Sequence, residues 1–142
     1  MQVAALPFVY EANKLKILLI TDQKKEKWLI PKGWPVKKLN FPESAAREAF
    51  EEAGVKGVIS NDFLGSFKYN KRIKKEQTVP CRVIVYGLYV TEQKSEWEEK
   101  GQRTLLWCSL EKAVEKTTDG NLVKLMKKLM RDPSPLISVS NL

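Results

Sequence analysis

The chain has 142 residues, which is enough for one domain of ordinary size and too few for two separate cores. Its 43% hydrophobic and 30% charged residues are typical of a folded globular protein and argue against disorder. The sequence contains no histidine and two cysteines, which excludes a Ser-His-Asp triad, a His-ligated zinc ion and a disulfide framework.

The formal net charge of +8 points to an anionic partner, such as nucleic acid, a phosphorylated small molecule or a membrane surface. A basic surface with no specific partner is the alternative. The longest apolar run, Val83–Val90, is far shorter than the roughly 20 residues of a spanning helix. Residues Met1–Tyr10 lack the basic start of an export signal. We therefore expect a cytoplasmic protein without a membrane partner.

The first third of the chain favours strands. Short apolar segments predict strands over Val3–Phe8, Leu15–Ile20 and Trp28–Ile30. Pro31, Gly33 and Pro35 then predict a loop.

A helix is predicted over Pro42–Ala53. Pro42 suits the first turn, where its missing N–H costs nothing, and Gly54 suits a C-terminal cap that needs positive φ. Alanines and one phenylalanine recur along a single face, so this face is expected to pack closely on another element.

The rest of the chain mixes strands and helices. Strands are predicted over Val55–Ile59, Phe63–Tyr69, Cys81–Thr91 and Thr104–Cys108, and helices over Leu110–Lys116 and Asp119–Arg131. Pro133 and Pro135 end the last helix, so 1–132 is expected to form the domain and 133–142 a peripheral tail. Because the elements do not alternate strictly, the class is α/β or α+β around one mixed sheet.

Acidic residues cluster on the helix over Pro42–Ala53. Glu48 and Glu52 are four residues apart and share a face, with Glu51 at an adjoining edge. Arg47 is four residues from both Glu51 and Glu43, so it can pair with either. Three carboxylates this close repel one another unless a cation lies between them, and carboxylate oxygens suit Mg²⁺. An ordinary solvated acidic face is the alternative.

The segment from Gly33 to Val55 resembles the Nudix box, whose pattern is G-x5-E-x7-R-E-U-x-E-E-x-G-U, with U a bulky aliphatic residue. The positions in register are Gly33, Arg47, Glu48, Glu51, Glu52, Gly54 and Val55. This resemblance implies an α/β/α sandwich, a single Nudix domain, and hydrolysis of a nucleoside diphosphate linked to another moiety, or of a related pyrophosphate, with Mg²⁺ or Mn²⁺.

Two positions depart from the box. Leu39 stands where the first Glu belongs, and Ala49 stands where a larger aliphatic residue is usual. Leu39 can neither bind metal nor pair with Arg47, so we predict that Glu43 supplies the missing salt bridge to Arg47.

Two further segments resemble the diphosphoinositol polyphosphate and diadenosine polyphosphate branch of the Nudix family. They are WLIPKGWP over Trp28–Pro35 and the spaced residues Trp97, Arg103 and Trp107. This resemblance implies metal binding by Glu48, Glu52 and the backbone carbonyl of Lys32. It also implies that Glu51 is the base that activates water, and that Arg103 contacts substrate phosphates.

The remaining site predictions follow from charge and aromatic character. Basic residues between Lys68 and Lys75, notably Lys71 and Arg72, are expected to bind an anionic polyphosphate together with Lys32 and Gly33. Trp34 is a candidate wall of the site, and Tyr69 a candidate stacking partner for a base. A solvated lysine loop is the alternative.

The predicted function is metal-dependent hydrolysis of a pyrophosphate bond in a diphosphoinositol or diadenosine polyphosphate. Two alternatives stay open. One is a Nudix activity on nucleoside triphosphates or RNA 5′ ends, and the other is a non-catalytic nucleic-acid-binding module, which lacks supporting motifs.

Overall fold

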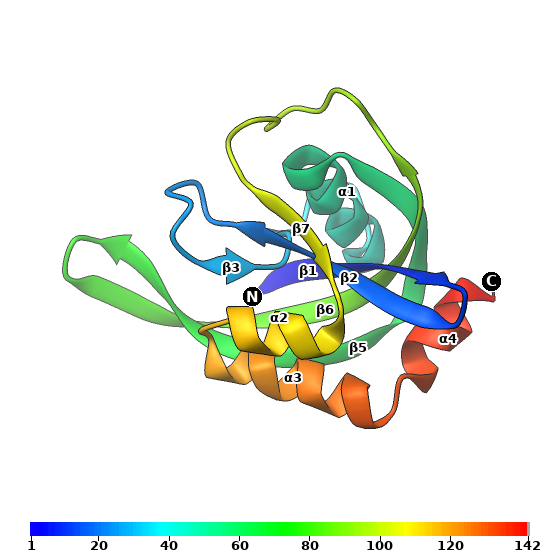
Figure 1. The fold of residues 1–142 in the computed structure, drawn as a ribbon. Helices are drawn as coiled ribbons and strands as arrows, with labels where there is room; N and C mark the ends of the chain where they lie inside the picture. Colours follow the sequence, from blue (N-terminus) through cyan, green and yellow to red (C-terminus); the bar gives the residue numbers. More distant parts are fainter. Residues whose placement is uncertain (142) are drawn as a thin grey trace.

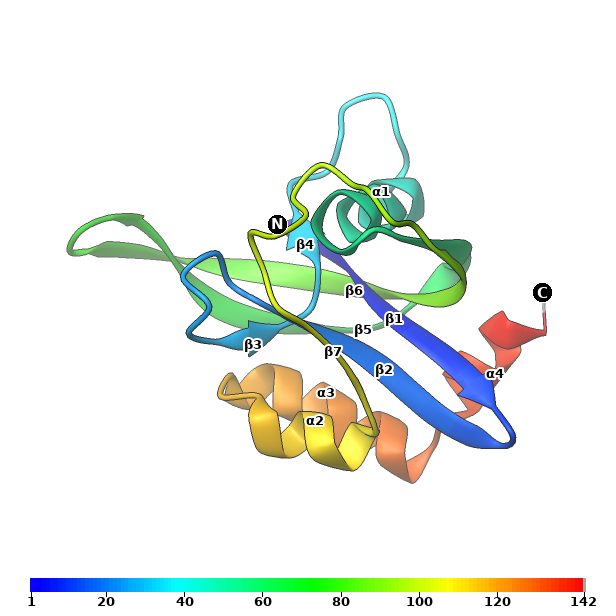
Figure 2. The ribbon, with the colours of Figure 1, turned by 45° about the horizontal axis from the view of Figure 1, so that its top comes forward.

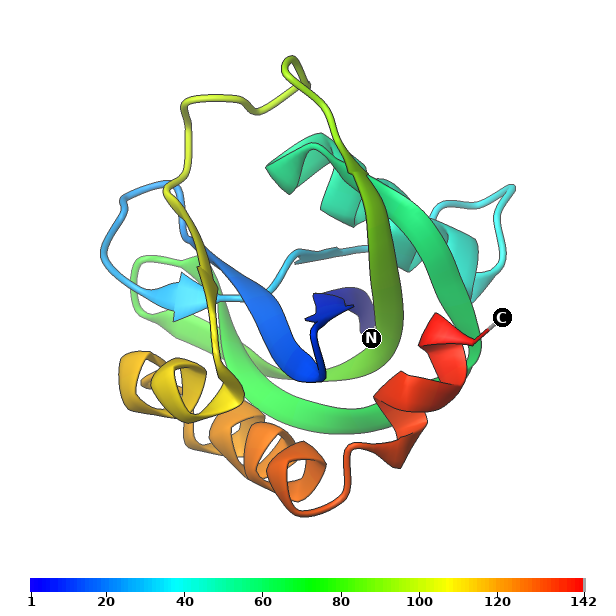
Figure 3. The same cartoon turned by 45° about the vertical axis from the view of Figure 1, so that its right-hand side comes forward.

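A computed structural model describes residues 1–141, which form one curled mixed sheet with helices on both faces (Figures 1 and 3). The strands are β1 (Gln2–Glu11), β2 (Lys14–Thr21), β3 (Trp28–Leu29), β4 (Lys32–Gly33), β5 (Val55–Lys74), β6 (Gln77–Gln93) and β7 (Leu105–Cys108). The main order is β3-β2-β1-β6-β5, with β4 paired to β1 and β7 paired to β2. The β1–β6 pair is parallel and the other named pairs are antiparallel.

Within residues 1–141, four helices complete the three layers. Helix α1 (Phe41–Ala53) covers one face of the sheet, and α2 (Leu110–Lys116), α3 (Gly120–Arg131) and α4 (Ser134–Ser140) cover the other (Figure 3). Each face has its own apolar core, because side chains of a strand point alternately to the two sides. The expected α/β/α arrangement around a mixed sheet is confirmed.

The start of α1 corrects one prediction. The Asn40 side chain accepts a hydrogen bond from the Glu43 backbone N–H at 2.8 Å, and the Glu43 carboxylate accepts one from the Asn40 N–H at 3.2 Å. This reciprocal capping box satisfies two backbone donors that a helix start leaves unpaired. Glu43 is therefore committed to the cap, and the prediction that it pairs with Arg47 is wrong.

Strands β5 and β6 form a long hairpin that extends beyond the body of the sheet (Figure 2). The two strands predicted at 55–59 and 63–69 are one strand, whose register shifts between Ile59 and Gly65. Such irregularities bend a strand without ending it. The basic segment from Lys68 to Lys75 lies on β5 and the hairpin turn, so it is paired backbone for most of its length.

The expectation of a peripheral tail at 133–142 is wrong for the described part of that segment. Residues 134–140 form α4, which buries Leu136 and Val139 in the core shared with α2 and α3. Pro135 lies in the first turn, where a proline is tolerated because that N–H has no helical partner. None of the helices in residues 1–141 has the length and apolar character to cross a membrane.

Candidate active site

Helix α1 is anchored by its small residues. Ala45, Ala49 and Ala53 are fully buried against the core that includes Val3 and Ala5 of β1. Alanine side chains let the helix approach the sheet closely, and the helix therefore holds its acidic residues near the short strand β4. The smaller residue at position 49 fits this close packing.

Two of the acidic side chains lie directly against the backbone of β4. The Glu52 carboxylate accepts a hydrogen bond from the Lys32 backbone N–H at 3.3 Å. The Glu48 carboxylate packs on Gly33 so closely that a Cβ there would lie 2.4 Å from its Cδ atom. Strand β4 is itself held by pairing with β1, at Val3 and at Ala4. The absence of a side chain at Gly33 thus leaves room for the Glu48 carboxylate.

Burial of these two carboxyl groups makes their charge costly. Burial raises the pKa of Glu48, which lies in contact with Glu52. Burial also raises the pKa of Glu52 to about 8, an effect that Arg103 opposes and the Glu48 contact reinforces. Because the two carboxyl groups are close together and partly shielded from water, a cation between or beside them would stabilise their charged forms.

Arg103 compensates only part of the negative charge of these two carboxyl groups. Its Nη2 atom is 3.9 Å from Glu52, beyond hydrogen-bonding distance. The same guanidinium group donates to the Thr21 carbonyl oxygen at 3.0 Å and to the Glu99 carboxylate at 3.2 Å. Arg103 is therefore fixed beside the acidic pair by other partners, with its Glu52 contact the longest.

Glu51 is paired with Arg47, and its charge adds to the rise in the pKa of Glu48. The Glu51 carboxylate accepts a hydrogen bond from Arg47 Nε at 2.8 Å, an ion pair at the partly exposed side of α1. The structure thus brings together two of the three predicted carboxylates. The assignment of Glu51 as the base that activates water stays a prediction.

A cleft of about 330 Å³ lies beside Glu52. Three cationic residues from different segments of the chain, Lys24, Lys32 and Arg103, also line it, together with the acidic residue Asp22. Burial lowers the pKa of the Lys32 ammonium, which lies 4.7 Å from the centre of the Tyr69 ring. The predicted grouping of Lys32 and Arg103 with the carboxylates is found in the structure.

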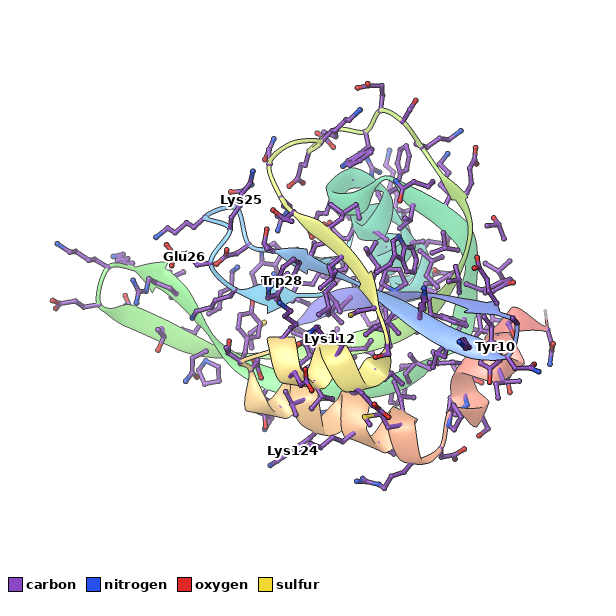
Figure 4. All side chains as sticks on the ribbon, in the orientation of Figure 1. Tyr10, Lys25, Glu26, Trp28, Lys112 and Lys124 are labelled. Carbon is purple, nitrogen blue, oxygen red and sulfur yellow. The ribbon has the colours of Figure 1, made fainter. Side chains whose placement is uncertain are left out.

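A larger cavity of about 630 Å³ adjoins this cleft, since Leu29 and Lys32 line both. Three aromatic side chains are among the residues that line it, beside lysines and Asp119. They are Trp28, Phe67 and Tyr69. Trp28, on β3, lies on the side of the molecule from which the β5–β6 hairpin extends (Figure 4). We call this space the aromatic cavity.

Four predicted substrate-binding residues line neither space, namely Gly33, Trp34, Lys71 and Arg72. Lys71 approaches the Trp34 ring at 5.5 Å, which connects the hairpin to the loop after Gly33. Trp34 remains 54% exposed and Arg72 is exposed on the hairpin. Neither these two residues nor Lys71 lines the cleft or the aromatic cavity, so their roles stay predictions.

The donor groups fit a hard divalent cation. Within residues 1–141, no three His, Cys, Asp or Glu side chains gather closely enough to hold an ion by themselves. Mg²⁺ commonly binds through one or two carboxylates and completes its shell with water and substrate phosphates. Glu48 and Glu52 supply that number, and the Lys32 carbonyl is the predicted further ligand.

Sequence reasoning missed two features of this region. Glu99 pairs with Arg103, and the four-residue spacing between them was the available signal. Asn121 lines the aromatic cavity at the start of α3, where only the tertiary fold brings it to β5.

Comparison with known proteins identifies the family of this chain. The family model of the NUDIX domain matches residues 1–131. Nudix hydrolase 16, mitochondrial, of Arabidopsis thaliana is 36% identical over 104 residues, which cover 71% of this chain and 57% of that protein. Human diphosphoinositol polyphosphate phosphohydrolase 3-alpha is 32% identical over 114 residues, which cover 79% of this chain and 65% of that protein.

The fold is also that of solved relatives. A crystal structure of a C. elegans Ap4A hydrolase binary complex superposes with a TM-score of 0.69 at 19% identity, covering 94% of this chain and 96% of that chain. The chain belongs to the Nudix family. It spans little more than half the length of the plant relatives that it matches.

Proposed function

We propose that the protein is a metal-dependent hydrolase that cleaves a phosphoanhydride bond in an anionic, nucleoside-containing polyphosphate. The observation that carries this proposal is the Glu48–Glu52 pair against β4, with the buried Glu52 facing a cleft that Lys24, Lys32 and Arg103 also line. The relatives named as hydrolases of polyphosphate compounds support the same class of reaction.

In the proposed reaction, water attacks one phosphorus atom and the bridging P–O bond breaks, leaving two phosphate-ended products. Glu48 and Glu52 would hold a Mg²⁺ or Mn²⁺ ion, which when bound neutralises phosphate charge. Lys32 and Arg103, which lie beside Glu52, bind phosphate oxygens of the substrate. Glu51, held by Arg47, is the proposed acceptor of the water proton. Such catalysis depends mainly on positioning and charge neutralisation.

The aromatic cavity supports a nucleoside as the second part of the substrate. Its volume of about 630 Å³ is within the usual range for small-molecule sites. Planar bases stack on aromatic side chains such as Trp28 and Tyr69, whereas an inositol ring offers no such face. A diphosphoinositol polyphosphate is the second candidate, which the basic hairpin and the named human relative favour.

The test is product release in Mg²⁺ from a panel of substrates. The panel contains a diadenosine polyphosphate, an inositol pyrophosphate, ATP and a 5′-triphosphate RNA. Glu52→Gln should lose most of the turnover, and Glu115→Gln, an exposed acid on α2, should retain it. Loss of turnover should coincide with weaker Mn²⁺ binding by calorimetry. No turnover of any substrate by the wild type would refute the proposal.

A further inference from the structure

The loop between β6 and β7, residues 94–104, lies along the C-terminal end of α1 (Figure 2). Its Glu99 N–H donates a hydrogen bond to the Glu51 carbonyl oxygen at 3.0 Å, in the last turn of α1, where carbonyl groups lack a helical partner. The Trp97 ring packs on Gly54 so closely that a Cβ there would lie 2.4 Å from Trp97 Cε3. The loop therefore holds Glu99 in a fixed place beside the helix that carries the acidic pair.

The Glu99 side chain binds Arg103 from the same loop. Arg103 Nε donates to Glu99 Oε1 at 3.2 Å, and Arg103 Nη2 also lies 3.2 Å from that oxygen. Arg103 Nη1 donates to the Thr21 carbonyl oxygen at 3.0 Å. The Arg103 side chain is only 12% exposed and that of Glu99 only 21%, so water screens this pair weakly. Glu99 and Thr21 together fix the planar guanidinium group in one orientation.

This orientation places Arg103 close to Glu52 without a hydrogen bond between them. Arg103 Nη2 is 3.9 Å from Glu52 Oε2, which is about 1 Å longer than a charge-assisted hydrogen bond between such groups. The other carboxylate oxygen, Oε1, already accepts a hydrogen bond from the Lys32 N–H. Oε2 is therefore the Glu52 atom that a divalent cation would bind most readily.

Glu99 by itself is unfavourable for the acidic pair. Burial is the main cause of the raised pKa of Glu48 and of Glu52, and the negative charge of Glu99 adds to the rise at both. A further carboxylate at this place thus works against the ionised forms that bind a cation. A benefit of Glu99 to the site must therefore act through the arginine that it holds.

We propose that Glu99 is a positioning residue, which keeps the Arg103 guanidinium from bonding to Glu52 and so leaves Glu52 Oε2 free for the divalent cation. This inference rests on the proposed function, which places the cation at Glu48 and Glu52. Without Glu99, Nη2 has to move by only about 1 Å to bond to Oε2, and the cation would then have to displace that bond. Held by Glu99, Arg103 stays at the cleft and its charge stays available to phosphate.

The experiment measures Mn²⁺ binding by calorimetry in the wild type, Glu99→Gln, Arg103→Gln and the double variant. We expect Glu99→Gln to weaken binding by about tenfold, the scale of one charge-assisted hydrogen bond. In the Arg103→Gln background the competing group is absent, so the same change should weaken binding by about twofold or less. If Glu99 acted only through its own charge, the loss in that background would be at least as large, and this result would overturn the inference.

Two more variants separate position from charge. Glu98→Gln removes the same charge from the neighbouring, exposed residue of the loop and should leave Mn²⁺ binding nearly unchanged. Glu99→Asp keeps the charge but withdraws the carboxylate from Arg103 by about 1 Å, and it serves also if Glu99→Gln does not fold. We expect Glu99→Asp to bind Mn²⁺ more weakly than the wild type does. Equal binding by these two proteins, or an equal loss in Glu98→Gln, would contradict the positioning role.

Turnover distinguishes this inference from the proposed function. In Glu99→Gln, half-maximal turnover should require about tenfold more Mn²⁺, and most of kcat should return at saturating Mn²⁺, because the cation then displaces Arg103 from Glu52. A low kcat at saturation with an unchanged Mn²⁺ requirement would refute the inference. If the wild type hydrolysed no substrate of the panel, the proposed function would fail, and the calorimetric comparison would still decide whether Glu99 controls access to Glu52.

Discussion

The contact between Gly33 and Glu48 allows a sharp test of how the site is built. Gly33 does not have positive φ, so its backbone accepts alanine without strain. The added methyl group would lie 2.4 Å from Glu48 Cδ and 2.5 Å and 2.7 Å from the two carboxylate oxygens. Ordinary contact begins at 3.4 Å, so the carboxylate must move by about 1 Å. A displacement of this size in a catalytic constellation costs roughly 10²-fold in rate.

We therefore expect Gly33→Ala to lower kcat/KM by about 10²-fold and to weaken Mn²⁺ binding, with a change in unfolding free energy below about 1 kcal/mol. Gly120→Ala is the control, since nothing lies within 4 Å of a Cβ at that position. The methyl group should act only through Glu48, so Gly33→Ala/Glu48→Ala should match Glu48→Ala alone. Wild-type kcat/KM in Gly33→Ala, or a double variant far slower than Glu48→Ala, would refute this reasoning.

Three further predictions concern stability. Burial raises the pKa of Glu52 from 4.5 to about 8, so the folded state holds this proton more tightly than the unfolded state. In EDTA, denaturant titrations should therefore show wild-type stability falling relative to Glu52→Gln as the pH rises from 4.5 to about 8. A pH-independent difference would contradict the assignment. Leu136→Ala should cost about 2–5 kcal/mol in urea unfolding, while Ile137→Ala, at a 36% exposed position, should cost far less. Equal losses would argue against docking of α4. Asn40→Ala should cost about 1 kcal/mol, measured in the same way, because it removes the cap of α1, and no change would show that the capping box contributes nothing.

Sequence patterns predicted the structure correctly where the interactions that determine it lie close together in the chain. The helix over Pro42–Ala53 was predicted within one residue of α1, because its alanine stripe, its early proline and the capping glycine all act within a few turns. The Glu48–Glu52 pair followed from four-residue spacing on that helix. The resemblance to the Nudix box indicated the chemistry that such a pair could serve.

Predictions from the same patterns were wrong where the contacting residues are far apart in the chain. Residues 134–140 form a helix because Leu136 and Val139 find an apolar face on the sheet, which their own short segment does not reveal. The predicted Glu43–Arg47 pair failed for a local reason instead. Spacing offered Arg47 two acids, and Arg47 pairs with Glu51 because the Asn40 cap holds Glu43.

Periodicity and fixed spacing are properties of single elements, so the sequence by itself predicted a mixed sheet with helices and placed Glu48 and Glu52 on one helix face. The resemblance to the Nudix box implied the α/β/α arrangement. Only the tertiary structure decided which groups surround the two carboxylates. Lys32, Arg103 and Glu52 meet in one cleft, and Asn121 reaches the backbone of Lys68, because the sheet curls and α3 packs against β5. Those meetings depend on packing between residues tens of positions apart, which no local pattern records.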